Sequence, residues 1–119
     1  MERHSIVGDK SFAFAVRIVK LYRYLCDEKR EYVLSKQLLR SGTSIGANIQ
    51  EGLKGQSKRD FLMKMNISLK EAGETQYWLR LLVASEVLTE MEAESITADC
   101  TELVKMLTSI VKTTSETCQ

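Results

Sequence analysis

The amino-acid sequence predicts an all-α protein, an antiparallel up-down-up-down four-helix bundle. The chain of 119 residues has no proline and only six glycines, and it is rich in strong helix formers such as leucine, lysine and glutamate. Apolar residues recur at intervals of three and four along four segments, which pack best as a four-helix bundle. The length fits one domain, residues 1–119.

The first helix is expected over about residues 11–29, with Asp9 as its N-cap. Its apolar stripe should contain four residues at helical spacing and three more that widen it. These are Ala15, Ile18, Tyr22 and Leu25, then Phe12, Val16 and Val19. The charged residues 27–30 are expected to turn the chain into the second helix.

The second helix is expected over about residues 31–52. Its seam begins apolar and becomes small or polar: Leu34, Leu38, Ser41, Ile45, Asn48 and Gly52. Gly42 and Gly46 lie one turn apart in this helix, and each costs up to about 1 kcal/mol relative to alanine. Two such costs predict that another helix approaches closely.

The third helix is expected over about residues 57–85, opened by a capping box of Ser57 and Asp60. Its seam keeps a strict spacing: Leu62, Met65, Leu69, Ala72, Gln76, Leu79 and Val83. A second capping box, Thr89 with Glu92, should open the fourth helix over about residues 89–114. The core face of that helix should consist of Ile96, Cys100, Leu103, Leu107 and Ile110.

The net charge of +1 hides an asymmetry along the chain. Residues 1–70 contain 14 lysines and arginines against 7 acids, whereas residues 71–119 contain 3 against 9. The basic and acidic halves can attract each other within one chain or between copies, or the basic half can face a polyanion.

The chain is expected to be cytoplasmic. Its longest apolar run is too short to cross a membrane, and its first ten residues lack the apolar core of a signal peptide. Cys26, Cys100 and Cys118 are an odd number without metal-ligand spacing, so we expect three reduced thiols.

Carboxylates on the predicted second and third helices suggest one enzymatic alternative, a bundle metal site. Glu71 and Glu74 lie one turn apart, and Glu51 could approach them. A di-iron bundle site also needs Glu-x-x-His pairs, but the only histidine is His4. We therefore expect no metal and no cofactor. Because buried polar groups must be paired, these carboxylates should instead accept hydrogen bonds from Ser41, Ser44, Asn48 or Arg40.

No other residue set indicates a reaction. Ser41 and Ser44 have no partner histidine for nucleophilic catalysis. The glycines of GTSIG, residues 42–46, do not follow a strand and lack the lysine of a phosphate-binding loop. We expect no enzymatic activity.

Dispersed cations on the first three helices are candidates for contacts to a nucleic-acid backbone. They are Arg17, Lys20, Arg23, Lys36, Arg40, Lys58 and Arg59. Lys54 lies on the same side of the second helix as Lys36 and Arg40. The alternative is an ordinary solvated surface, since the tyrosines do not interleave with these cations as base-stacking residues would.

Tyr77 and Trp78 are adjacent on one helix, so they cannot both face the core of the same bundle. Tyrosine and tryptophan are favoured in protein–protein contacts. Together with the glycines of the second helix, this pair predicts self-association more strongly than a small-molecule pocket.

Three segments of the chain closely resemble the bacterial four-helix-bundle family named for proteins encoded in intervening sequences of 23S rRNA genes. They are SFAFAVRIVKLYRYL (11–25), QLLRSGTSIGANIQEG (37–52) and FLMKMNISLKEAGETQYWLRLL (61–82). The resemblance implies an antiparallel bundle that assembles into a homopentamer, with no established enzymatic activity. The family is also similar to the accessory variability determinant of diversity-generating retroelements, a strongly basic pentamer that engages nucleic acid and a reverse transcriptase.

The resemblance extends to the residues singled out above. Arg40, Ser41, Ser44, Asn48 and Glu51 match the family pattern of the second helix, and Glu71, Glu74, Tyr77 and Trp78 match that of the third. We interpret these residues as packing and interface positions, because no catalytic role comes with them. The chain departs from the retroelement protein in charge, since its isoelectric point is about 7.7.

The leading hypothesis is a non-enzymatic, cytoplasmic homopentamer of bacterial origin that offers basic surface to RNA or DNA, as an accessory factor. The alternative is a protein–protein scaffold that docks a partner enzyme, such as a reverse transcriptase, without nucleic-acid contact. A carboxylate metal-binding bundle is the third hypothesis, and the missing histidine ligands disfavour it.

Overall fold

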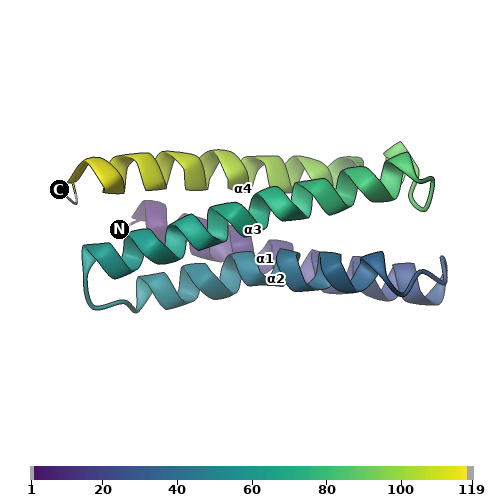
Figure 1. The fold of residues 1–119 in the computed structure, drawn as a ribbon, viewed down its shortest axis with the longest axis horizontal. Helices are drawn as coiled ribbons and strands as arrows, with labels where there is room; N and C mark the ends of the chain where they lie inside the picture. The colour runs from purple at the N-terminus through teal and green to yellow at the C-terminus, as the bar shows by residue number, and fades with distance from the viewer. Residues whose placement is uncertain (1, 118–119) are drawn as a thin grey trace.

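The computed structural model describes residues 2–117, with side chains from residue 6 onward, and this part of the chain forms four helices (Figure 1). They are α1 (Glu2–Asp27), α2 (Leu34–Leu53), α3 (Lys58–Ala84) and α4 (Glu90–Thr117). Each helix packs on the next along the chain, and α4 packs back on α1. The prediction of an all-α, up-down-up-down four-helix bundle is confirmed.

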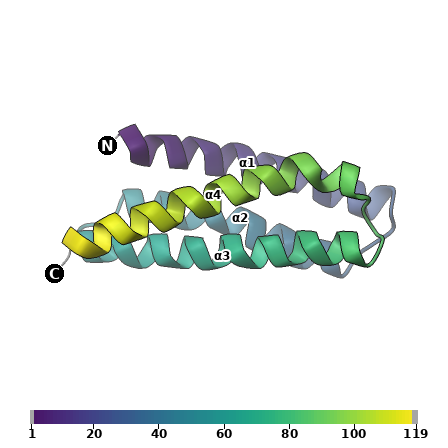
Figure 2. The same cartoon turned by 90° about the horizontal axis from the view of Figure 1, so that it is seen from above.

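The bundle is elongated, with extents of 47 × 21 × 20 Å. The turn between α2 and α3 lies at the same end as the beginning of α1 and the end of α4 (Figures 1 and 2). We call this the α2–α3 end. The two other connections lie together at the opposite end, which we call the α3–α4 end. No helix of the described part is both long and apolar enough to cross a membrane.

Helix α1 begins at Glu2 instead of near Ser11, so the prediction that Asp9 caps this helix is wrong. Val7 is fully buried in the core. Gly8 lies against the end of α2, where an added Cβ would be 3.4 Å from Leu53 Cδ1. Packing of these first turns on the bundle therefore keeps them helical, and no local cap is needed.

Helix α2 begins at Leu34, three positions after the predicted start at Glu31. Arg30 has a positive φ of 56° in the turn before it. The Glu31 carboxylate accepts hydrogen bonds from the backbone N–H groups of Val33, Leu34 and Ser35, at 3.0, 2.9 and 2.6 Å. Desolvation of Glu31 opposes ionisation, but these three donors outweigh it and lower the pKa of this carboxyl. Glu31 thus caps the helix that it was predicted to begin.

The capping box predicted for α4 is complete, whereas at α3 the Ser57 half of the predicted box is shown. The Ser57 hydroxyl oxygen accepts the backbone N–H of Asp60 at 3.1 Å. Thr89 and Glu92 form a reciprocal capping box, in which each side chain accepts the backbone N–H of the other residue, at 3.0 and 2.8 Å. These caps fix the starts of α3 and α4 close to the predicted positions.

The core confirms some predicted faces and corrects others. The five core residues predicted for α4 are all buried. In α1, Ile18 and Leu25 are buried as predicted, but Phe12 and Val16 are exposed and Phe14 takes the core position. Phe14 lies four residues before Ile18 and eleven before Leu25, which keeps one helical face, whereas Phe12 lies toward the outside of α2.

The inward faces of α2 and α3 also differ in detail from the predicted seams. Ile49 is fully buried in α2, whereas Asn48 is only half-buried at the edge. In α3, three of the seven predicted seam residues are buried: Met65, Ala72 and Leu79. Two hydroxyl residues, Ser68 and Thr75, are fully buried beside them. The α2–α3 seam is therefore polar at its centre.

The glycines of α2 allow close contact with α1, as the sequence predicts. A Cβ on Gly42 would lie 2.7 to 2.9 Å from three side-chain atoms of Ile18. A Cβ on Gly46 would lie 3.3 Å from the backbone oxygen of Ser11. Cys26 and Cys100 are free thiols, while the prediction for Cys118 concerns a residue outside the described part.

Candidate functional site

The buried polar groups of α2 and α3 hold the two helices together. Thr75 Oγ1 lies 2.9 Å from Ser41 Oγ, and both residues are fully buried. A second bond lies one turn further along α2 and two turns earlier in α3. There the Ser68 hydroxyl donates a 2.8 Å hydrogen bond to the backbone oxygen of Ile45. No buried polar side-chain atom of the described residues lacks a partner. The buried hydroxyls of the seam therefore all have hydrogen-bond partners.

Arg40 joins the same two helices at the surface. Its guanidinium donates to Glu71 Oε1 at 3.3 Å and forms an ion pair with Glu74. The indole N–H of Trp78 donates to Glu74 Oε2 at 3.0 Å. The Trp78 hydrogen bond and then the Arg40 hydrogen bond lower the pKa of Glu74. Ionised Glu74 on α3 therefore holds α2 through its ion pair with Arg40.

Of the four donors predicted for these carboxylates, only Arg40 is correct. Ser41 pairs with Thr75 instead. Ser44 donates to the backbone oxygen of Arg40 at 2.7 Å, and the Asn48 amide donates to that of Ser44 at 2.8 Å. Short polar side chains inside a helix commonly bond to the carbonyl one turn earlier, and this local partner prevails over the distant carboxylate.

The approach of Glu51 to Glu71 and Glu74, which the sequence allowed as part of the metal-site alternative, does not occur. Glu51 is exposed and pairs with Lys64 at 2.6 Å, nearer the α2–α3 end. Among the described residues, no three or more His, Cys, Asp or Glu side chains gather in a way that could hold a metal ion.

Tyr77 and Trp78 separate as the sequence predicts. Trp78 is half-buried and packs on the core, while Tyr77 is 53% exposed on the outside of α3. The two rings make an edge-on contact with centroids 5.1 Å apart. Tyr77 thus offers an aromatic surface outside the bundle core.

Two of the seven predicted phosphate-binding cations are already paired within the chain. Arg40 is one, as described above. Arg17 is the other, and its guanidinium donates to Asp99 Oδ2 at 2.6 Å and to Ser95 Oγ at 3.1 Å. Arg17 and Arg40 therefore each join two neighbouring helices. This role depends on which helices are adjacent.

The Arg17 contact belongs to a polar ladder between α1 and α4. Lys10 pairs with Glu102 at 3.2 Å, and Lys29 pairs with Glu92 at 3.4 Å. The Tyr24 hydroxyl also donates to Glu92. This hydrogen bond, followed by the one from the Thr89 N–H, lowers the pKa of Glu92 to about 2. The basic and acidic halves of the sequence therefore meet within one chain.

The other five predicted cations are exposed and form no ion pair with the described residues. They are Lys20, Arg23, Lys36, Lys58 and Arg59. Lys58 and Arg59 begin α3 at the α2–α3 end, and Lys54 lies at the end of α2 beside them, also exposed and unpaired. We call Lys54, Lys58 and Arg59 the basic turn. The sequence signal for Lys54 was present, because Gly55 and Ser57 mark the turn that places it near the others.

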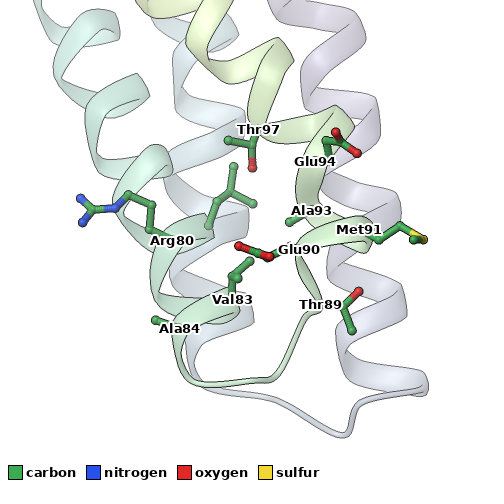
Figure 3. A pocket seen from close by; sticks show the side chains of 10 residues that line it. Arg80, Val83, Ala84, Thr89, Glu90, Met91, Ala93, Glu94 and Thr97 are labelled. Atoms are coloured by element: carbon green, nitrogen blue, oxygen red, sulfur yellow. The ribbon is translucent and has the colours of Figure 1, made fainter.

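A hollow between α3 and α4 was not predicted from the sequence. It has a volume of about 1050 Å³ at the α3–α4 end, and it is lined by apolar residues such as Leu79, Val83 and Ala93. Glu90 lies over the hollow, whereas Arg80 points away from it (Figure 3). The sequence does hold one indication of this surface, the apolar residue Met91 beside the capping box. This residue is 85% exposed in the structure.

Comparison with known proteins agrees with this geometry. A crystal structure at 1.70 Å resolution of a protein of unknown function from the S23 ribosomal protein family, from Bacteroides thetaiotaomicron VPI-5482, is similar. It has 56% sequence identity and a TM-score of 0.90, over 92% of this chain and 98% of that one. No curated protein matches the chain. The family model described as 23S rRNA-intervening sequence protein matches residues 3–109. The chain therefore belongs to the 23S rRNA-intervening sequence protein family.

Proposed function

We propose that the protein is a non-enzymatic, cytoplasmic homopentamer that binds RNA or DNA as an accessory factor. The observation that carries this proposal is the basic turn. Its three cations are exposed at one end of the bundle and form no ion pair with the described residues, and the acid within residues 54–60 is Asp60 at the start of α3. Such cations are what a phosphate backbone requires.

Self-assembly would multiply this small site. In a closed cyclic assembly whose bundles run along the ring axis, all copies point in the same direction and every basic turn lies on one side of the ring. Several weak sites that engage one polyanion together bind far more tightly than each does alone. The value of five copies follows from the resemblance to the family, and the exposed Phe12, Val16 and Met91 side chains support association.

The absence of an enzymatic role is supported by how the polar residues are occupied. Ser41 pairs with Thr75, and Glu71 and Glu74 are bound by Arg40. These groups hold helices in register, so we assign them to packing and not to a reaction.

Binding to fragments of 23S rRNA tests the proposal with an RNA that would be present where such a gene lies within a 23S rRNA gene. Fluorescence anisotropy at about 50 and 200 mM salt should show an affinity that falls steeply as salt rises. Lys58→Gln with Arg59→Gln should weaken binding and reduce the salt dependence. The matched control is Lys70→Gln with Lys105→Gln, which removes two exposed, unpaired cations from the sides of the bundle.

No binding at low salt, or binding that is indifferent to salt, would refute the nucleic-acid role. An equal loss in the control pair would refute the assignment to the basic turn. If the protein assembles without binding nucleic acid, the scaffold alternative is favoured. Its test is the co-purification of a partner enzyme, such as a reverse transcriptase, after nuclease treatment.

A further inference from the structure

Ion pairs among the described residues follow only two of the four seams between helices. Those at the α1/α4 seam join Lys10 to Glu102, Arg17 to Asp99, and Lys29 to Glu92. Those at the α2/α3 seam join Arg40 to Glu71 and Glu74, and Lys64 to Glu51. The α1/α2 and α3/α4 seams lie on opposite sides of the bundle and carry none. Their outer faces are apolar instead.

The α1/α2 face is a ridge beside a groove. Phe12 is 67% exposed and Val16 is 40% exposed. Between Phe12 and α2 runs a groove of about 250 Å³, lined on the α2 side by Thr43 and Ala47 among others. Helical spacing continues this face toward the α3–α4 end. There it reaches Arg23 on α1 and Lys36 on α2, both exposed and without an ion pair.

The α3/α4 face has the complementary character. Its hollow of about 1050 Å³ is apolar inside. Glu90 lies over it, and Glu94 lines it from α4 with its carboxylate directed away from α3 (Figure 3). Neither forms an ion pair with the described residues. Arg80 lines the other edge but directs its guanidinium away (Figure 3). The face is thus an apolar hollow with one carboxylate over it and a second at its outer α4 edge, at the same end as Arg23 and Lys36.

We infer that the α1/α2 face of one copy packs on the α3/α4 face of the next copy, head to tail. This inference rests on the self-assembly proposed above and names the surfaces that carry it. Contacts between two different faces of identical chains generate a closed ring when the rotation closes. Arg23 and Lys36 of one copy then meet Glu90 and Glu94 of its neighbour, and opposite charges at the rim favour this pairing over others.

The two faces also match in position along the long axis of the bundle. Gly42 packs on Ile18, and Ser41 on the same helix pairs with Thr75, so Ile18 and Thr75 lie at one level. Because α1 and α3 run in the same direction, two residues back along each places Val16 level with Gly73. In a ring whose axis runs along the bundles, copies lie at equal height, and the exposed Val16 then faces Gly73 of the neighbour.

Gly73 has no role that the single chain explains. A Cβ added there would have no atom within 4 Å, apart from its own helix backbone, yet glycine weakens a helix interior. Close approach of a neighbouring copy gives this glycine a reason. Gly73→Leu should accordingly leave the fold intact and weaken assembly, since the new side chain projects into empty space only in the isolated chain.

Charge reversal tests the inference on the nuclease-treated full chain, with assembly measured by light scattering over a dilution series. Arg23→Glu with Lys36→Glu should raise the concentration for half-assembly on the order of tenfold or more. Glu90→Lys with Glu94→Lys should do the same. The chain that carries all four reversals regains complementary rims and should assemble like wild type. Lys54→Glu with Lys58→Glu, an equal change in charge at the α2–α3 end, should have little effect.

The outcomes separate the two proposals. A wild-type chain that is monomeric throughout would overturn the self-assembly proposed above and this inference with it. A wild-type assembly that is insensitive to the reversals, or is not restored by the fourfold exchange, would overturn only the assignment of faces. A folding defect in the Glu90 and Glu94 variant cannot imitate the expected result, because reversals on a distant helix would not rescue it.

Discussion

Ser41 and Thr75 place their hydroxyl oxygens 2.9 Å apart at the centre of the α2–α3 seam, where neither residue touches solvent. Thr75 Oγ1 is also 2.8 Å from the backbone oxygen of Glu71, and Ser41 Oγ is 3.5 Å from that of Leu38. Two buried hydroxyls are costly unless each has a partner, and here each serves the other. This pair fixes the register of the two helices.

A double-mutant cycle on this pair should show coupling. Ser41→Ala and Thr75→Val should each destabilise the fold by about 0.5–1.5 kcal/mol, because each removes the buried hydrogen bond that joins α2 to α3. The double variant should cost less than the sum of the two, with an interaction free energy of at least about 0.5 kcal/mol. Urea unfolding measures all four proteins. Strict additivity would show that the pair contributes nothing to the seam.

Alanine substitutions at the two glycines of α2 should differ in cost. Gly42→Ala places a methyl group under 3 Å from the fully buried Ile18 side chain. This should cost about 1–3 kcal/mol, reduced by up to about 1 kcal/mol of helix propensity. At Gly46 the nearest contact is 3.3 Å, so the two effects should nearly cancel. Thermal unfolding of both variants would contradict the packing described here if Gly46→Ala were the more damaging.

The α1–α4 ladder should make the fold sensitive to acid. The pKa of Glu92 falls from about 4.5 to about 2 in the folded protein, first through the Tyr24 hydroxyl and then through the Thr89 N–H. Ionised Glu92 therefore stabilises the folded state above about pH 4.5, and this contribution disappears as the pH falls toward 2. Circular dichroism melts across that range should show a smaller loss of stability for Glu92→Gln than for wild type.

Glu116→Gln is the matched control for the acid experiment. It makes the same chemical change on the same helix, at an exposed residue that forms no ion pair with the described residues. Its pH dependence should follow that of wild type. Parallel curves for wild type and Glu92→Gln would mean that this carboxylate does not couple α1 to α4.

The two described thiols should react at different rates. Burial raises the pKa of Cys100 to about 12, and its thiol lies 3.5 Å from the backbone oxygen of Ala72. Cys26 is only partly buried. In a Cys118→Ser background, a thiol-specific reagent at pH 8 should label Cys26 in the folded protein and Cys100 only after unfolding. Mass spectrometry of the labelled chain reads out both sites, and rapid folded-state labelling of Cys100 would contradict its burial.

The helices and their later caps could be predicted because their signals are local. The reciprocal contact of Thr89 and Glu92, for example, needs only residues three apart. The core face of α1 could not be predicted so well, because its middle is apolar on several sides. Phe12 and Phe14 both fit an apolar stripe, and only the position of α2 decides which one is buried.

The partners of polar residues were harder still to predict. Arg40 was assigned correctly because a long cation has few competing acceptors on its own helix. Ser44 and Asn48 were not, since the backbone carbonyl one turn earlier is always within reach. Arg17 depends on Asp99, more than eighty residues away, so its role follows from tertiary register and not from sequence spacing.

The claim that this chain acts as an assembly and not as a single catalytic bundle is tested most directly by native mass spectrometry of the full chain at micromolar concentration. The predicted result is one dominant species at five times the 13.5 kDa chain mass. A species that remains at 13.5 kDa at every concentration would contradict it.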